Sequence, residues 1–256
     1  MSPTIDLNAD LGESYGPWPM GDDAAMLDIV TSANIACGFH AGDPEIMAKT
    51  VTLCLEKNVG IGAHPGFNDL HGFGRRRIHG TPQAQMEAML IYQIGALQAI
   101  ARSQGAKVRH VKMHGALSNM ASEDAELAAQ CIGAAAKADP TLILVAVAAT
   151  ALQSEGEAAN IGLAREVFAD RAYQPNGLLV PRSTPGAVIH EAEIAADRVL
   201  RMVEERAVTA MDGTKVPVEP DTVCVHGDEP SAVKLAEAVR KRLEDAGVKI
   251  RTFGTA

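Results

Sequence analysis

Short apolar runs alternate with longer amphipathic stretches along the whole chain. Short runs of apolar or β-branched residues between turn residues predict strands, and apolar positions that recur every three or four residues predict helices. Strict alternation of the two is typical of a parallel sheet or barrel wrapped in helices. We predict strands at Thr4–Ala9, Ala33–Phe39, Gly60–His64, His110–His114, Leu142–Ala148, Ala164–Ala169 and Thr222–His226, with a last short one near Val248–Phe253.

Helices fill most of the gaps between these strands. Asp43 and Thr81 each precede a proline, so a side-chain oxygen can cap the helix while proline takes the first helical position, where its missing N–H costs nothing. The segment Arg206–Pro220, with Asp212-Gly213 between two short runs, predicts a β-hairpin inserted before the seventh strand. The clearest helices are predicted at Pro44–Lys57, Pro82–Gln104, Asp124–Ala138, Ile189–Glu205 and Ser231–Ala246.

One face of several predicted strands is polar. Strands that helices cover on both sides should instead be continuously apolar. With a two-residue period, Asp6, Asn8 and Asp10 share one face of the first strand, and the fourth strand repeats the pattern at Lys112 and His114. A barrel has this distribution if its helices cover the outside and the carboxyl ends of its strands carry the chemistry.

Ionisable residues recur at successive strand ends, and we interpret five of them as a candidate catalytic group. The alternative is that each polar side chain caps the following helix or satisfies a loop. His226 and Asp228 end the seventh strand, and for Asp43 and Asp228 capping and function stay equally open. The candidate catalytic residues are Asp10, His40, His64, Lys112 and His114.

The chain of 256 residues carries 23 basic and 32 acidic side chains, a net charge of −9, and is 47% hydrophobic. This hydrophobic fraction can form a sizeable core and excludes disorder as the dominant state. The acidic balance argues against nucleic acid and membrane surfaces as partners, because both would require a basic surface. Length alone fits one large domain or two small ones, but no linker interrupts the alternation. We expect a single β/α barrel domain over residues 1–256.

Cysteine usage and the amino-terminal sequence indicate a soluble, cytoplasmic protein. The four cysteines lie far apart and form no CxxC pair, so neither a zinc ribbon nor a disulfide framework is indicated, and we expect buried, reduced thiols. The segment MSPTIDLNAD has no basic region followed by an apolar one, and no run of 18 apolar residues occurs anywhere. The cysteines are Cys37, Cys54, Cys131 and Cys224.

Common catalytic motifs are missing from the sequence. The dipeptide Gly-Lys does not occur, so there is no P-loop, and ATP would have to bind in another cradle or in a partner. HExxH fails because Ile194 stands where the second histidine would be, and there is no GxSxG elbow. Catalysis would therefore fall on carboxylates, imidazoles and Lys112, either directly or through a metal.

Seven segments, in order along nearly the whole chain, closely resemble the LamB/YcsF family. The resemblance implies a distorted, seven-stranded, TIM-like β/α barrel related to the polysaccharide deacetylases. It also implies ATP-dependent 5-oxoprolinase activity, in which the lactam of 5-oxoproline (pyroglutamate) is opened to L-glutamate together with subunits B and C. The segments are NADLGES at 8–14, ANIACGFHAGDP at 33–44, GAHPGFND at 62–69, GFGRR at 72–76, VKMHGALSN at 111–119, FADRAY at 168–173 and HGD at 226–228.

A mechanism for this activity assigns roles to the candidate residues as hypotheses. A lactam is a poor electrophile, and transfer of phosphate from ATP to the amide oxygen would activate it toward water. That attack requires a general base, support for the tetrahedral intermediate and a cation for the substrate carboxylate. We expect Asp10 or His64 as base or orienting group and Lys112 as charge stabiliser. The candidate substrate-binding residues are Asn8, Arg75, Arg171, His226 and Asp228, with Arg75 or Arg171 as the carboxylate or phosphate clamp.

Two other functions remain open at this point. Asp10, His40 and His64 could form a site of two histidines and one carboxylate for a divalent metal, as in a deacetylase-like amide hydrolase. The sequence departs from the deacetylase pattern, which pairs two aspartates in its first motif and places a histidine where Gly60 stands here. The other alternative is a non-catalytic subunit that only binds substrate for a partner.

Overall fold

The computed structural model describes residues 3–226 and 232–254, and within them seven parallel strands close into a barrel. Each strand pairs with the next in the order β1, β2, β3, β4, β5, β6, β9, and β9 pairs back with β1. This confirms the predicted seven-stranded β/α barrel. The barrel strands are β1 (Thr4–Leu11), β2 (Ser32–Ala36), β3 (Gly60–His64), β4 (Val108–Lys112), β5 (Ile143–Val147), β6 (Leu163–Phe168) and β9 (Thr222–Val225).

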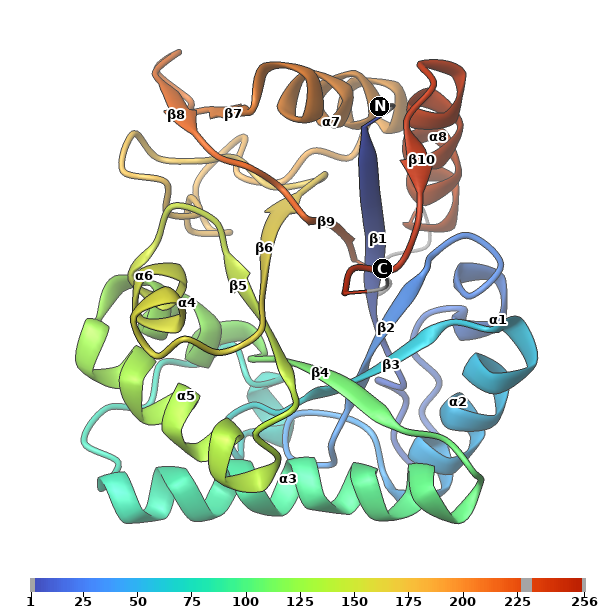
Figure 1. Cartoon of the computed structure of the whole chain (residues 1–256), viewed down its shortest axis with the longest axis vertical. Helices are drawn as coiled ribbons and strands as arrows, with labels where there is room; N and C mark the ends of the chain where they lie inside the picture. The colour runs from blue at the N-terminus through green and yellow to red at the C-terminus, as the bar shows by residue number, and fades with distance from the viewer. Residues whose placement is uncertain (1–2, 227–231, 255–256) are drawn as a thin grey trace.

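Helices surround the barrel on its outside (Figure 1). The long α3 runs along the lower edge of the view, and α7 and α8 lie side by side at the upper edge. A short β10 (Lys249–Ile250) pairs with the start of β1 outside the closed ring. The helices are α1 (Asp23–Met26), α2 (Pro44–Lys57), α3 (Gln83–Ser103), α4 (Gly115–Glu123), α5 (Ala125–Ala138), α6 (Ala151–Ala158), α7 (Ala192–Glu205) and α8 (Ala232–Asp245), with a 3-10 turn, η1, at Leu70–Gly72.

The helix caps differ in how well they follow the sequence. Asp43 caps α2 as predicted, because its carboxylate accepts hydrogen bonds from the backbone N–H groups of Glu45 and Ile46. At α3 the prediction of Thr81 is wrong, since the helix begins one residue later and Pro82 occupies the cap position without a side-chain hydrogen bond.

Two strands end earlier at the carboxyl edge of the barrel than the sequence predicts. Strand β2 stops at Ala36, and β4 stops at Lys112. Gly38 and Gly115 follow with φ angles of +91° and +53°, which lie outside the strand region. Consequently His40 lies in the loop after β2, and His114 is the residue that precedes α4.

The segment between α7 and β9 contains a small antiparallel pair. Strand β7 (Ala207–Thr209) pairs with β8 (Lys215–Pro217), and the two are joined by a turn in which Gly213 donates its N–H to the carbonyl of Ala210. Figure 1 places this pair at the edge of the molecule, beyond the barrel strands.

Polar side chains fill the barrel interior, while the apolar face of β1 packs outward. Ile5 and Leu7 are at most 1% exposed and belong to the core that the helices cover. Asp6 and Asn8 point the other way and hydrogen bond to Thr222 on β9. The two-residue period of the first strand therefore separates core from barrel interior as predicted.

A close approach inside the barrel requires glycine at position 62. The ring of His110 on β4 donates or accepts a hydrogen bond with Asn34 of β2 at 2.9 Å and passes directly over Gly62 of β3. A Cβ at Gly62 would collide with this ring. His110 is thus part of the barrel scaffold.

All four cysteines are buried and free of disulfides. No helix among the described residues is both long and apolar enough to cross a membrane.

Candidate active site

A cavity of about 320 Å³ opens where the barrel strands end. Residues from β1, β3, β4 and the end of β9 line its floor, and arginines from neighbouring loops line its side. This is the end of the barrel at which the sequence places the candidate catalytic group. The lining includes Asp10, Glu13, His64, Arg75, Lys112, His114, Arg171, Arg182 and His226.

Lys112 forms the centre of the floor. Its Nζ lies 2.9 Å from Asp10 Oδ1 and 2.8 Å from Glu166 Oε1, and it donates to Cys224 Sγ at 3.1 Å. Asp10, Glu166 and Cys224 lie on β1, β6 and β9, none of which adjoins β4, so this contact set spans the barrel. A buried ammonium is stabilised only when its donors are matched in this way.

Opposite charges fix the protonation of this pair. Burial by itself lowers the pKa of Lys112, but the adjacent carboxylates of Asp10 and Glu166 raise it well above its usual range. Burial likewise raises the pKa of Asp10, while His64 and Lys112 lower it well below the usual value. At neutral pH the floor therefore holds a charged ammonium beside an ionised carboxylate.

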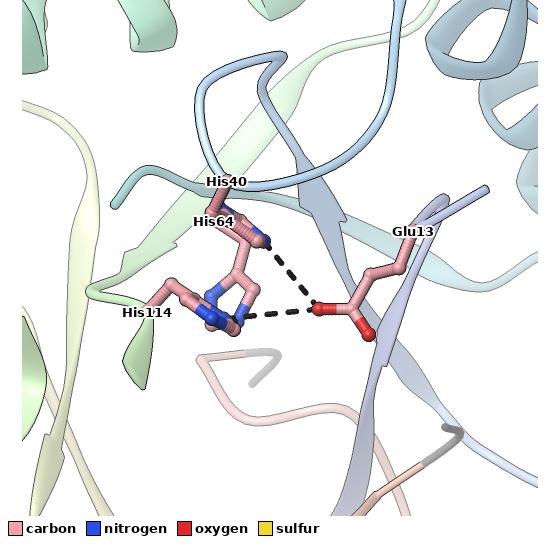
Figure 2. Close-up of side chains that lie close together, drawn as sticks. All are labelled: Glu13, His40, His64 and His114. Atoms are coloured by element: carbon pink, nitrogen blue, oxygen red, sulfur yellow. Dashed lines mark hydrogen bonds and ion pairs between the residues drawn. The ribbon is translucent and has the colours of Figure 1, made fainter. Parts of the chain in front are cut away.

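Three imidazoles and Glu13 gather beside Asp10, as Figure 2 shows. His64 Nε2 lies 3.2 Å from Asp10 Oδ2 and 3.0 Å from His114 Nδ1. Glu13 Oε1 lies 3.4 Å from His40 Nε2 and 3.7 Å from His114 Nδ1. The His40 and His114 rings stack in parallel with centroids 3.6 Å apart. Burial and the neighbouring histidines hold the pKa of His40 and of His114 well below its usual value, so both rings are neutral.

On the opposite side of the floor, His226 and Asp170 form a hydrogen-bonded pair. His226 Nδ1 lies 2.8 Å and 2.7 Å from the two carboxylate oxygens of Asp170. Although burial raises the pKa of Asp170, His226, Arg182 and Arg171 lower it below its usual value, so the carboxylate is ionised and accepts from His226. The other ring nitrogen of His226, a residue that lines the cavity, is thereby left for a ligand.

Arginines give one wall of the cavity a positive charge. Arg171 is 5% exposed, and its Nη2 donates to the carbonyl of Val180 at 2.6 Å. Its Nε is buried and donates to no described residue. Burial and the nearby Arg182 lower the pKa of Arg171 to about 10, which leaves it a cation at neutral pH. Arg75 lies over the ring of Phe73, 4.9 Å from its centroid.

The structure brings most of the predicted site residues together. Asp10, His64, Lys112, His114, Arg75, Arg171 and His226 all line the one cavity. Asn8 does not, because its side chain bonds to Thr222 and Asn34 deeper in the barrel, which corrects the substrate-binding prediction to a supporting place beneath Lys112. His40 is 0% exposed and lies behind Glu13 and His64, so a direct contact with substrate is wrong. Asp228 lies outside the described residues.

The sequence prediction lacks three residues of the site. Glu166 and Asp170 lie on and just after β6, whose predicted strand is mostly apolar and gives no clear polar face. Glu13 follows β1 after Gly12, whose φ of +68° ends the two-residue period and turns the chain back toward the barrel. The position of Glu13 within the motif NADLGES is the one signal in the sequence that points to it.

Comparison with known proteins decides the family. Residues 5–256 match the LamB/YcsF family profile. The chain belongs to the LamB/YcsF family. It is 56% identical over 250 residues to the A subunit of 5-oxoprolinase from Rhodopseudomonas palustris strain BisB5, an alignment that covers 97% of this chain and 98% of that protein.

Solved structures agree with this membership and with the barrel. The lactam utilization protein from Thermus thermophilus is 45% identical to this LamB/YcsF chain and superposes with a TM-score of 0.91 over 98% of this chain and 100% of that one. A family 4 carbohydrate esterase from Streptomyces lividans superposes with a TM-score of 0.52 at 13% identity, over 98% of this chain and 93% of that one. The second likeness shows that the barrel is of the deacetylase type and shows the fold alone.

Proposed function

We propose that this chain opens the lactam ring of 5-oxoproline to give L-glutamate, as the A subunit of an ATP-dependent 5-oxoprolinase. The high identity to proteins that carry the name of this 5-oxoprolinase component supports the substrate. The single structural observation that carries the proposal is the convergence of Asp10, Lys112 and His226 on one cavity with a cationic wall. These groups are the ones that hydrolysis of a small anionic amide requires.

The bond that must break determines the chemistry. If ATP phosphorylates the amide oxygen and water then adds to the carbon, loss of phosphate from the tetrahedral intermediate would only re-form the lactam. Productive collapse breaks the C–N bond and leaves an acyl phosphate, which a second water converts to glutamate and phosphate. The leaving nitrogen therefore requires a proton, and the site requires a general acid as well as a base.

Asp10 is placed to act as the base. It lines the cavity, it is ionised, and the contacts with Lys112 and His64 fix the orientation of its carboxylate. A water molecule that hydrogen bonds to Asp10 from the cavity would be deprotonated as it attacks the ring carbon. The Lys112 ammonium beside it stabilises the negative charge that develops on the former carbonyl oxygen.

His226 is placed to act as the acid. Asp170 holds its Nδ1–H, so the proton delivered to the leaving nitrogen comes from Nε2 on the cavity side. The carboxylate of 5-oxoproline, which does not react, would bind to the buried guanidinium of Arg171, whose Nε–H is directed to no described residue.

ATP and the partner subunits complete the proposal. The sequence has no P-loop, and we assign ATP binding and phosphoryl transfer to subunits B and C, in the cytoplasm. This chain would receive the activated lactam and carry out the two hydrolytic steps.

Asp10→Asn tests the proposal in the complex reconstituted with its partner subunits. A positioned base contributes about 10²–10⁴-fold, so we expect glutamate formation to fall by that factor in kcat. The substitution keeps the shape of the side chain and leaves Asn34 a hydrogen-bond partner.

Asp28→Asn is the matched control, since Asp28 is an exposed aspartate paired with Lys57 on the outside of the barrel. It should form glutamate at the wild-type rate. Wild-type turnover in Asp10→Asn would contradict the assignment of the base.

A further inference from the structure

A second feature of the site, independent of the lactam chemistry, is the cluster of Glu13, His40, His64 and His114 (Figure 2). One oxygen or nitrogen from each side chain lies within 4.8 Å of the other three. The four side chains come from the ends of different strands or the loops after them, and none is more than 6% exposed.

Backbone carbonyls fix which ring nitrogens carry protons. His64 Nδ1 lies 2.8 Å from the carbonyl oxygen of Lys112, and His114 Nε2 lies 2.8 Å from that of Phe73. A carbonyl oxygen can only accept, so both of these nitrogens donate. In the neutral rings, His64 Nε2 and His114 Nδ1 are then the nitrogens with lone pairs, and they face each other at 3.0 Å.

Two lone pairs at this distance need a positive charge between or beside them. A single shared proton would satisfy His64 and His114 only. Both ring nitrogens of His40 also lack a hydrogen bond to any described residue, and His40 Nε2 and Glu13 Oε1 are 3.4 Å apart in the same cluster. A metal ion satisfies all four atoms at once.

The spacing of the donor atoms fits such an ion. Bonds of 2.0–2.1 Å in a tetrahedral zinc site place neighbouring ligand atoms about 3.3 Å apart. The separations here are 3.0, 3.4 and 3.7 Å. The carbonyls of Lys112 and Phe73 provide the outer hydrogen bonds by which metal-binding histidines are normally oriented.

We propose that Glu13, His40, His64 and His114 bind one divalent transition-metal ion, for which zinc or cobalt is the natural probe. Three imidazoles and one carboxylate suit such ions better than magnesium or calcium. This set replaces the metal site of Asp10, His40 and His64 expected from the sequence, since Asp10 is engaged with Lys112 and Asn34.

A second group of possible donors in the cavity, Asp10, Cys224 and His226, is less suited to a metal ion. The Lys112 ammonium lies 2.9 Å from Asp10 Oδ1 and 3.1 Å from Cys224 Sγ, so two of the three donors already face a cation. An ion there would have to displace Lys112.

The test uses the full chain, stripped with a chelator and titrated with Zn²⁺ by calorimetry and with Co²⁺ by visible absorption. We expect one ion per chain, a cobalt spectrum with ligand-field bands, and a rise in Tm on loading. In Glu13→Gln and His40→Phe we expect affinity to fall by ~100-fold or more, because removal of an outer-sphere partner alone costs 10–100-fold. No substrate is needed, so the result does not depend on the proposed function.

His79→Gln removes an exposed imidazole outside the cluster and should bind zinc like the wild type. Glu13→Gln differs by one atom and preserves shape, so it decides the question if His40→Phe does not fold. Wild-type protein that binds no ion, or Glu13→Gln that binds as tightly as wild type, would overturn the proposal and leave a proton shared by His64 and His114.

Discussion

At the scale of single residues, the site depends on charges that the barrel buries and pairs. Lys112 is 3% exposed and lies between the carboxylates of Asp10 and Glu166, which are 8% and 1% exposed. Each charge is tolerated only because the others are present. The strand period predicts that Lys112 and Asp10 face inward, but pairing Glu166 with Lys112 requires the barrel order of β4 and β6, which the local sequence does not contain.

Lys112→Met tests this interdependence through stability. The substitution keeps the apolar stem and removes the ammonium, which leaves two carboxylates facing each other without a cation. Removal of one member of a buried pair costs about 3–5 kcal/mol, and we expect a loss of that size in chemical denaturation. Lys137→Met, at an exposed pair with Glu87, should change stability by less than about 1 kcal/mol.

Asp6 predicts a pH dependence of stability that its neighbours do not share. Burial raises the pKa of Asp6 from 3.8 to about 6, against the hydrogen bonds it accepts from Thr222, Thr31 and Ser32. The folded state holds this proton more tightly than the unfolded state. Its contribution to stability is therefore present at low pH and is lost as the pH rises from about 4 through 6.

Unfolding of wild type and Asp6→Asn should be compared at pH 4.5 and pH 7.5. The variant cannot ionise, so the stability of wild type relative to Asp6→Asn should fall by roughly 2–3 kcal/mol over the pH range from 4 to 7. A difference that stays constant with pH would show that Asp6 is ionised in the folded protein at both values.

At the scale of elements, the sequence predicts what local chemistry determines and misses what tertiary contacts determine. The amphipathic period and the Asp43-Pro44 start place α2 at its observed bounds. Helix α4 is absent from the prediction, because its start at Gly115 has a positive φ and is fixed by a hydrogen bond from Ala116 N to the carbonyl of Gly74, a contact that the local sequence does not reveal. Loops determine where His40 and Glu13 lie, so the sequence predicts the cluster only in part.

Asp43→Ala tests the local chemistry at α2. Loss of the two cap hydrogen bonds to Glu45 and Ile46 should reduce stability by about 1 kcal/mol in denaturant unfolding. Asp43→Ser restores a capping oxygen and should recover most of the loss. Equal stability of Asp43→Ala and wild type would mean that α2 does not depend on its cap.

At the scale of the whole molecule, closure of the barrel assembles the site. Asp10, His64, Lys112 and His226 come from four separate strand ends, and they meet only because β9 pairs back with β1. The net charge of −9 does not oppose binding of an anionic substrate, since the local field of Arg171, Arg182 and Lys112 determines the potential in the cavity. Family motifs, strand periodicity and cavity geometry thus identify the same end of the molecule.

The most direct test of the central claim measures ATP consumption and L-glutamate formation from 5-oxoproline with the partner subunits alone and then with this chain added. We predict that the partners alone form no glutamate, that the wild-type chain restores turnover, and that Asp10→Asn does not. Glutamate formation by the partners alone at full kcat, with this chain lowering only KM, would show uniform binding rather than chemistry and would contradict the account.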